Sequence, residues 1–141
     1  MTIYALSTVQ GQSGVAIIRV SGPLAEEAIF KLTHKKLKPR MATLCKILNS
    51  KKEALDEAVV IFFEEKRSFT GESVAEFQTH GGEAIIRSVL RELSLIKGLR
   101  PAEPGEFTKQ AYLSGKINLV QAEGLGDLIS AQTEKQRQQA M

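Results

Sequence analysis

The chain contains few of the side chains that usually perform catalysis or bind metal ions. Its two histidines, His34 and His80, are far apart in the sequence, and a metal site needs more ligands than this pair provides. Its single cysteine, Cys45, can form neither an internal disulfide nor a multi-thiolate site, and the apolar run ATLCKIL around it predicts burial. For His80, in the string THGG, we expect a hydrogen-bonded structural role rather than catalysis.

Two opposite charges, Arg19 and Glu76, lie in separate stretches that are rich in β-branched and aromatic residues. Judged from the residues alone, they are best interpreted as a cross-strand ion pair that contributes roughly 0.2–1 kcal/mol. Lys116 follows Gly115 at a helix break and would, on the same grounds, be an ordinary exposed lysine. The sequence contains none of the catalytic motifs HExxH, CxxC and GxSxG. It also lacks GxxxxGK[ST], so these 141 residues contain no P-loop that could bind GTP.

Positive charge is concentrated in one part of the chain. The net charge is only +3, but eight basic residues follow one another without an intervening carboxylate: Lys31, Lys35, Lys36, Lys38, Arg40, Lys46, Lys51 and Lys52. Such a segment could contact phosphates, because neutralising them gives nucleic-acid affinity that does not depend on base sequence. The segment lacks interleaved aromatic residues and any known reader motif, so we favour a solvated loop surface over a nucleic-acid site.

The first elements that must position these residues form a hairpin and a helix. Thr2 to Thr8 and Val15 to Ser21 are β-rich, and the glycine-containing GQSG connects them, which predicts two paired strands. Pro23 occupies the place of a first helical residue, and the apolar residues after it recur at intervals of three and four. This spacing predicts a short amphipathic helix.

Three further strands are predicted over Ala42 to Leu48, Leu55 to Phe63 and Val74 to His80. After Gly82 the apolar residues follow a helical period, and Gly98 is placed to end that helix through a left-handed cap. The order of elements is therefore ββα-βββα.

Two more helices are predicted after this unit. The first spans PGEFTKQAYL, beginning at Pro104 and ending at Ser114 and Gly115. The second has Asn118 as its N-cap and Gln121 at the capping-box position, and it has no stop signal before the last residue. The whole pattern is an α+β fold, and we expect the natural chain to continue.

Composition fits one ordinary globular domain. The chain has 141 residues, of which 43% are hydrophobic and 25% charged, and this length allows a core without disulfides or metal. No apolar run approaches the roughly 18 residues of a membrane span, and MTIYALSTVQ lacks the features of a secretory signal. We therefore expect a cytoplasmic protein with no membrane association.

Three strings carry a resemblance to a known family. GVAIIRVSG (Gly14 to Gly22), SFTGESVAEFQTHGG (Ser68 to Gly82) and RPAEPGEFTKQAYLSGKINLVQAEGLGDLI (Arg100 to Ile129) together resemble the N-terminal region of the MnmE (TrmE) family of tRNA-modification GTPases. The similarity extends over nearly the whole chain and is weakest between Lys31 and Glu65. Three such strings in the right order and spacing make the resemblance specific.

The resemblance implies a fold and a division of the chain. In this family the ββα-βββα unit, with a mixed sheet, is similar to the tetrahydrofolate-binding fold of the aminomethyltransferases of glycine cleavage, and two chains complete a dimer. Residues 1–117 would form the tetrahydrofolate-binding and dimerisation domain. Residues 118–141 would begin a helical domain.

The resemblance also implies an activity for the whole protein. That protein would be a GTP hydrolase that uses GTP, Mg and K, and would modify the wobble uridine of tRNA together with the FAD-dependent partner protein MnmG (GidA). Its one-carbon donor would be 5-formyltetrahydrofolate or a related tetrahydrofolate. The GTPase domain lies outside this sequence, so we expect no turnover by this chain alone.

The folate-binding positions of the family fall on Arg19, Glu76 and Lys116, which match in residue type. A pterin presents two parallel donors that one carboxylate can accept, which suits Glu76, and folate's anionic and carbonyl groups suit Arg19 and Lys116. With the resemblance, ligand binding is favoured over the ion-pair interpretation. A stand-alone folate-dependent group-transfer domain and a basic RNA-binding module stay open as alternatives.

Overall fold

The computed structural model describes residues 1–8, 14–118, 120, 121, 123 and 124. Its centre is a six-stranded sheet with the strand order β3-β4-β5-β2-β1-β6. The strands are β1 (Thr2–Leu6), β2 (Val15–Ser21), β3 (Thr43–Leu48), β4 (Ala54–Phe63), β5 (Val74–His80) and β6 (Leu99–Pro101). Every pair is antiparallel except β1 with β6, which is parallel. The predicted α+β class with a mixed sheet is therefore confirmed.

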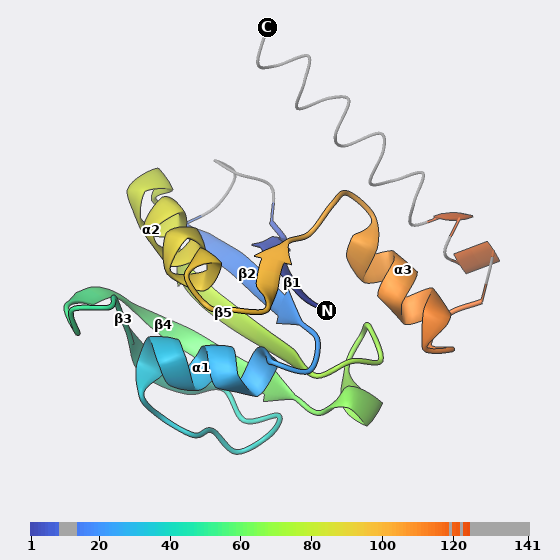
Figure 1. Ribbon diagram of the computed structural model, residues 1–141, viewed down its shortest axis with the longest axis horizontal. Coiled ribbons are helices and arrows are strands. Elements are labelled where there is room, and N and C mark those ends of the chain that lie inside the picture. Colours follow the sequence, from blue (N-terminus) through green and yellow to red (C-terminus); the bar gives the residue numbers. More distant parts are fainter. Residues whose placement is uncertain (9–13, 119, 122, 125–141) are drawn as a thin grey trace, which may run out of the picture.

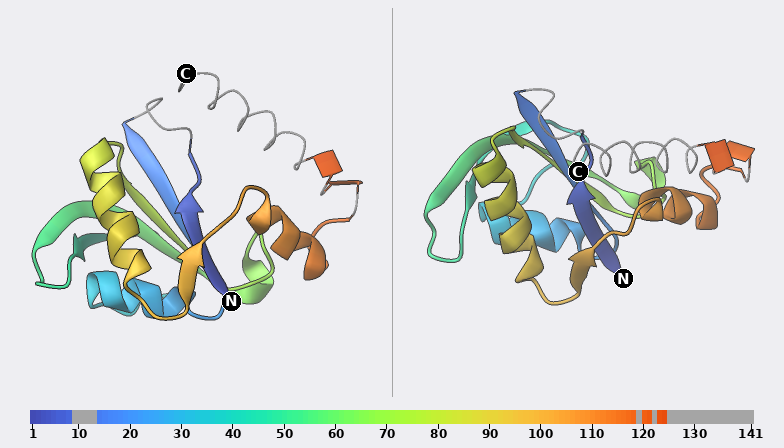
Figure 2. Two further views of the ribbon diagram at one scale, coloured as in Figure 1. Left: turned by 45° about the horizontal axis from the view of Figure 1, so that its top comes forward. Right: turned by 90° about the horizontal axis from the view of Figure 1, so that it is seen from above.

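Two helices cover one face of this sheet, and a third lies at one end of it (Figures 1 and 2). The covering helices are α1 (Ala25–Thr33) and α2 (Glu83–Ser94). The third, α3 (Glu106–Leu113), lies beside the segment between β4 and β5, which holds a short 3-10 helix over Glu65–Arg67.

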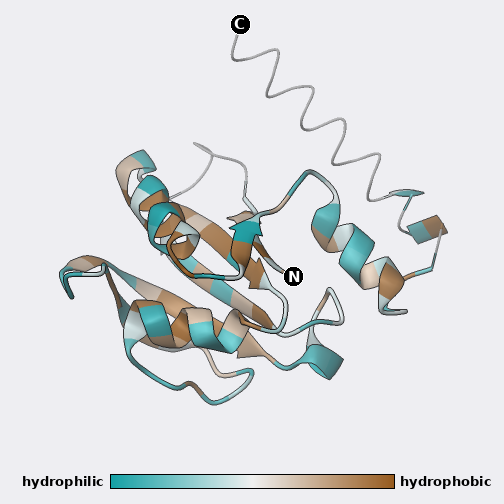
Figure 3. Ribbon diagram, in the orientation of Figure 1, coloured by the Kyte–Doolittle hydropathy of each residue, from teal (hydrophilic) through white to brown (hydrophobic). Residues whose placement is uncertain are grey.

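The core lies between the sheet and the two covering helices. Ile18, Val20 and Phe77 point from the strands into this layer with no exposed surface. Ile29 from α1 and Val89 from α2 pack against them, and Figure 3 shows hydrophobic residues along the strands. Each such side chain contributes roughly 1.5–3 kcal/mol when fully buried, which is why the helical apolar stripes must face the sheet.

The helix predicted from Pro23 begins two residues later, at Ala25. The chain leaves β2 through Gly22, whose φ of +143° brings the backbone so close to Thr2 that an added Cβ would lie 2.6 Å from the Thr2 Cα. The Leu24 N–H then donates to the Thr2 hydroxyl at 3.0 Å. Pro23 therefore lies in the turn that follows β2, and the helix starts only after it.

The end of α2 also differs from the prediction. The helix ends at Ser94 with Leu95 as a right-handed C-cap, so Gly98 is not its cap. Gly98 has a φ of +95° and instead turns the chain into β6. The strand β6 could not be predicted from the sequence, because three residues ending in proline are too few to show alternation.

The capping box predicted after α3 is confirmed. The Asn118 N–H donates to Gln121 Oε1 at 2.9 Å, and the Gln121 N–H donates to Asn118 Oδ1 at 2.8 Å. Most of the helix predicted beyond it, residues 125–141, lies outside the described residues. The proposed division at residues 117 and 118 stays a prediction.

Candidate functional site

Arg19 and Glu76 are direct partners across β2 and β5. The Arg19 Nη2 lies 3.1 Å from the Glu76 Oε1, and the two side chains are 23% and 18% exposed. Because their neighbours Ile18, Val20 and Phe77 point into the core, the pair lies on the other face of the sheet, away from α1 and α2. The predicted cross-strand ion pair is confirmed, and it is partly accessible.

Two aromatic rings lie close to the guanidinium of Arg19. Its Cζ lies 5.8 Å from the centre of the Phe69 ring and 5.5 Å from that of Phe107, within the range of cation–π attraction. Its Nε is buried and finds no acceptor among the described residues. An unpaired buried donor is rare in proteins, so the Nε of Arg19 is an unusual feature of this site.

The sheet face around this pair is apolar and largely open. Ile17, Val59 and Ile61 lie on it half-buried, and Leu44 on the edge strand β3 is 59% exposed. No helix within the described residues covers this part of the sheet (Figure 2). The site therefore combines a fixed ion pair with flat apolar surroundings.

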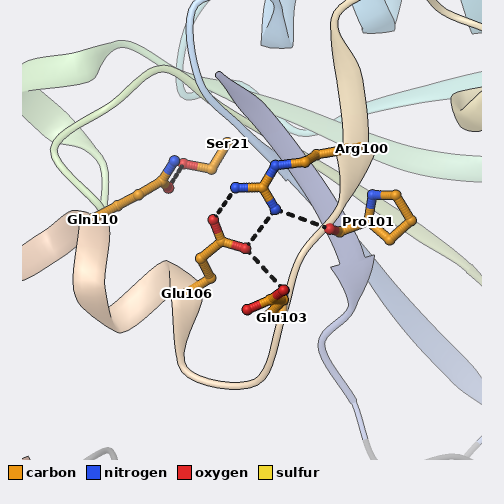
Figure 4. Close-up of polar contacts among 6 residues, drawn as sticks. All are labelled: Ser21, Arg100, Pro101, Glu103, Glu106 and Gln110. Atoms are coloured by element: carbon orange, nitrogen blue, oxygen red, sulfur yellow. Dashed lines mark hydrogen bonds and ion pairs between the residues drawn. The ribbon is translucent and has the colours of Figure 1, made fainter.

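A hydrogen-bonded network joins the β4–β5 segment to α3 beside the site. The Ser21 hydroxyl bonds to the Thr70 hydroxyl at 2.7 Å. It donates to Gln110 Oε1 at 2.6 Å, as Figure 4 shows. The Ser114 hydroxyl donates to the Thr70 carbonyl at 2.5 Å. These bonds hold the segments that carry Phe69 and Phe107 around Arg19.

Lys116 lies apart from the ion pair. Its Nζ donates to the Lys66 carbonyl at 2.7 Å, at the start of the same segment that carries Phe69. In the part of the chain that the structure describes, no hydrogen bond links it to Arg19 or Glu76. The structure thus brings together two of the three candidate residues and leaves the third, exposed, on a neighbouring loop.

A second ion pair, which the sequence analysis missed, anchors the start of α3 (Figure 4). The Arg100 guanidinium donates through both terminal nitrogens to the two carboxylate oxygens of Glu106, one of them at 2.8 Å. The Glu103 N–H donates to Glu106 as well, at 2.9 Å. The hydrogen bond from Arg100 lowers the pKa of Glu106 to about 2, and the same bond raises the pKa of Arg100.

The ion pair between Arg100 and Glu106 could not be predicted from the sequence, because the strand β6 that positions Arg100 was not predicted. The two residues are only six positions apart, but the loop between them must fold back for the pair to form. The string RPAEPGEF, with two prolines and a glycine, is the one signal of such a turn.

His80 is hydrogen-bonded and Cys45 is buried, as the sequence predicted. The His80 Nδ1 lies 2.7 Å from Asp56 Oδ1, and its backbone N–H donates to Asp56 Oδ2 at 2.8 Å, which ties the end of β5 to β4. Cys45 is buried, and burial raises the pKa of its thiol despite the opposing effect of Lys35. Within the described residues no group of three or more metal-ligating side chains gathers, and no helix there is long and apolar enough to cross a membrane.

The fold and site define an α+β domain with an arginine–glutamate pair on an open sheet face. Residues 2–116 match the family model described as GTP-binding protein TrmE N-terminus. The chain belongs to this family, as the three strings predicted.

Similar curated proteins agree with this assignment. The chain is 51% identical over 141 residues to the mitochondrial 5-taurinomethyluridine-[tRNA] synthase subunit GTPB3 of Danio rerio, covering 99% of this chain and 28% of that protein. It is 50% identical over 142 residues to the tRNA modification GTPase MnmE of Parvibaculum lavamentivorans, covering 99% of this chain and 32% of that protein. It is 51% identical over 144 residues to the tRNA modification GTPase MnmE of Pelagibacter ubique, covering 100% of this chain and 32% of that protein. The chain thus spans about a third of these relatives' length.

Proposed function

We propose that the chain is the N-terminal module of a tRNA-modification GTPase, and that it binds a tetrahydrofolate one-carbon donor and forms a homodimer. The observation that carries the proposal is the partly open pair of Arg19 and Glu76. Its guanidinium lies close to two aromatic rings and has a buried donor without an acceptor among the described residues. The names of the similar proteins support the tRNA-modification part.

The residues of the site suit a folate chemically. Glu76 gives one carboxylate oxygen to Arg19 and keeps acceptor capacity for the paired donors of a pterin. Arg19 keeps donors for a carbonyl or carboxylate, and Phe69, 46% exposed, offers a flat apolar surface beside them. Lys116 would reach anionic groups from the neighbouring loop. The bound 5-formyltetrahydrofolate, or a related tetrahydrofolate, supplies the one-carbon unit, and these side chains hold and orient it.

The open sheet face supports the homodimer. Leu44, Ile17, Val59 and Ile61 leave apolar surface beside the ion pair. Burial of such surface is worth roughly 25 cal/mol for each Å², so a second copy seated on this face would gain free energy and also shield the site from water. The whole protein would use GTP with Mg and K, and would act on tRNA with the partner protein MnmG (GidA).

Titration calorimetry and sedimentation velocity test the proposal on the 141-residue chain. We expect 5-formyltetrahydrofolate to bind with one site per chain, and the chain to sediment as a dimer at micromolar concentration. GTP is the negative control, because the sequence has no phosphate-binding P-loop. Absence of folate binding would refute the folate site. A strictly monomeric species that binds folate would refute a site completed by two chains.

A further inference from the structure

A surface hollow lies where the ends of α1 and α2 meet the tip of the β3–β4 hairpin. It has a volume of about 510 Å³, which is in the range of small-ligand sites. Lys31 comes from α1, Lys52 from the hairpin tip, and Lys97 from the turn after α2. Segments far apart in the sequence therefore bring three lysines to one place, on the side of the sheet that is opposite to Arg19 and Glu76.

These three lysines are exposed, and within the described residues none of them takes part in an ion pair. Two carboxylates also line the hollow, Glu27 and Glu92, but Glu92 accepts a hydrogen bond from the Ser50 hydroxyl at 2.9 Å. An adjoining hollow of about 420 Å³ adds two further cations, Lys51 and Arg91, and one further carboxylate, Glu53. Cations therefore outnumber carboxylates along this surface, and anionic groups would be attracted to it.

The structure also places an aromatic pair beside the lysines. Phe30 on α1 is 53% exposed, and its ring lies 6.0 Å from the ring of His34, which lines the hollow. Exposed Leu95 adds apolar surface to the lining of the hollow. Phe30 lies just outside the basic segment, one residue before Lys31, and was therefore not counted among its residues.

We propose that this surface binds a single-stranded segment of RNA, with phosphates on Lys31, Lys52 and Lys97 and a base stacked on the exposed ring of Phe30. Single strands are bound by combining a basic groove with aromatic rings on which bases stack, and both parts are present here. The choice of RNA among polyanions rests on the proposed role in tRNA modification. This surface and the folate site lie on opposite faces of the sheet, so a substitution can abolish RNA binding without affecting folate binding, and the reverse.

Fluorescence anisotropy of the 141-residue chain with a labelled single-stranded RNA oligonucleotide tests the site across a series of salt concentrations. Each neutralised phosphate of a single strand contributes roughly 0.7 to the slope of log K against log salt. Replacing Lys31, Lys52 and Lys97 together by alanine should therefore reduce that slope by about 2. Phe30→Ala should weaken binding at least about fivefold without changing the slope, because stacking involves no counterion release.

Lys46→Ala is the matched control for Lys52→Ala. Lys46 belongs to the same basic segment and is exposed, but it lies on the opposite face of the sheet, where it pairs in register with Glu57. Equal weakening by both variants, or RNA affinity unaffected by Phe30→Ala, would overturn the site. Heparin competing as well as RNA, with no effect of Phe30→Ala, would show a general polyanion surface instead. Titration of 5-formyltetrahydrofolate into the same variants should be unchanged, which separates this proposal from that of the folate site.

Discussion

The Arg19 Nη2 lies 3.1 Å from Glu76 Oε1, while the Nε of the same guanidinium is buried without an acceptor in the part of the chain that the structure describes. The ion pair therefore uses only part of the hydrogen-bonding capacity of Arg19. Phe69 and Phe107 hold the guanidinium in place, so its remaining donors are oriented before any ligand arrives. Such preorganisation reduces the entropy that binding must overcome.

Glu76→Gln should weaken 5-formyltetrahydrofolate binding at least tenfold. An amide has one acceptor oxygen and no charge, so it cannot accept two parallel pterin donors and also pair with Arg19; the loss of such a contact costs roughly 1.5–3 kcal/mol. Calorimetric titration gives the affinity, and circular dichroism checks the fold. Glu57→Gln is the control, because Glu57 is exposed on the same face and makes no contact with Arg19. Unchanged affinity in Glu76→Gln would rule out a pterin at this residue.

Arg19→Lys should also weaken folate at least tenfold, with little loss of stability. Lysine keeps the charge but replaces the planar fork by a single ammonium group, which cannot pair with Glu76 and a ligand in the same geometry. Affinity by titration and the thermal midpoint should be measured on the same preparation. A lowered midpoint with unchanged affinity would mean that Arg19 only braces the sheet.

Lys116→Ala should reduce folate affinity while changing the thermal midpoint little. In the folded chain the Lys116 Nζ makes a single exposed hydrogen bond to the Lys66 carbonyl, and such bonds contribute roughly 0.5–1.5 kcal/mol at most. Lys109→Ala, on the exposed side of α3, controls for the loss of one positive charge. If both variants bound folate as the parent does, Lys116 would have no part in the site.

Gly71→Ala should destabilise the chain more than Gly105→Ala does. Both glycines are left-handed, with φ of +79° and +82°, and alanine there costs roughly 1–2 kcal/mol in backbone strain. A Cβ at Gly71 would also lie 2.0 Å from the Ser114 Oγ, whereas a Cβ at Gly105 meets nothing within 4 Å. Urea unfolding of both variants isolates the clash, and adding Ser114→Gly to Gly71→Ala should recover part of the loss. Equal destabilisation would contradict the packing of α3 on this loop.

Acid should remove the contribution of the Arg100–Glu106 pair to stability. The pKa of Glu106 is about 2 in the folded chain against an ordinary value of 4.5, so its contribution is present above pH 4.5 and is lost as the pH falls toward 2. The difference in free energy of unfolding between the parent and Glu106→Gln should therefore shrink over this interval. Urea unfolding at several acidic pH values measures it, and a pH-independent difference would argue against the pair.

Sequence patterns were sufficient where the interaction is local or periodic. Alternation along β2 and β5 determines which residues enter the core, and this alone allows Arg19 and Glu76 to share the other face. The capping box of Asn118 and Gln121 depends on residues three positions apart, so it could be predicted correctly. Family strings, rather than periodicity, pointed to Lys116.

Tertiary structure alone decided the surroundings of Arg19 and the gathering of Lys31, Lys52 and Lys97. Ser21 bonds to Gln110, which is 89 residues away, and Ser114 bonds to Thr70, which is 44 residues away. These contacts place Phe69 and Phe107 on the guanidinium. No local pattern records such pairings, because they depend on where sheet and helices pack, and that packing is set by the burial of apolar surface across the whole chain rather than by any pair of neighbours.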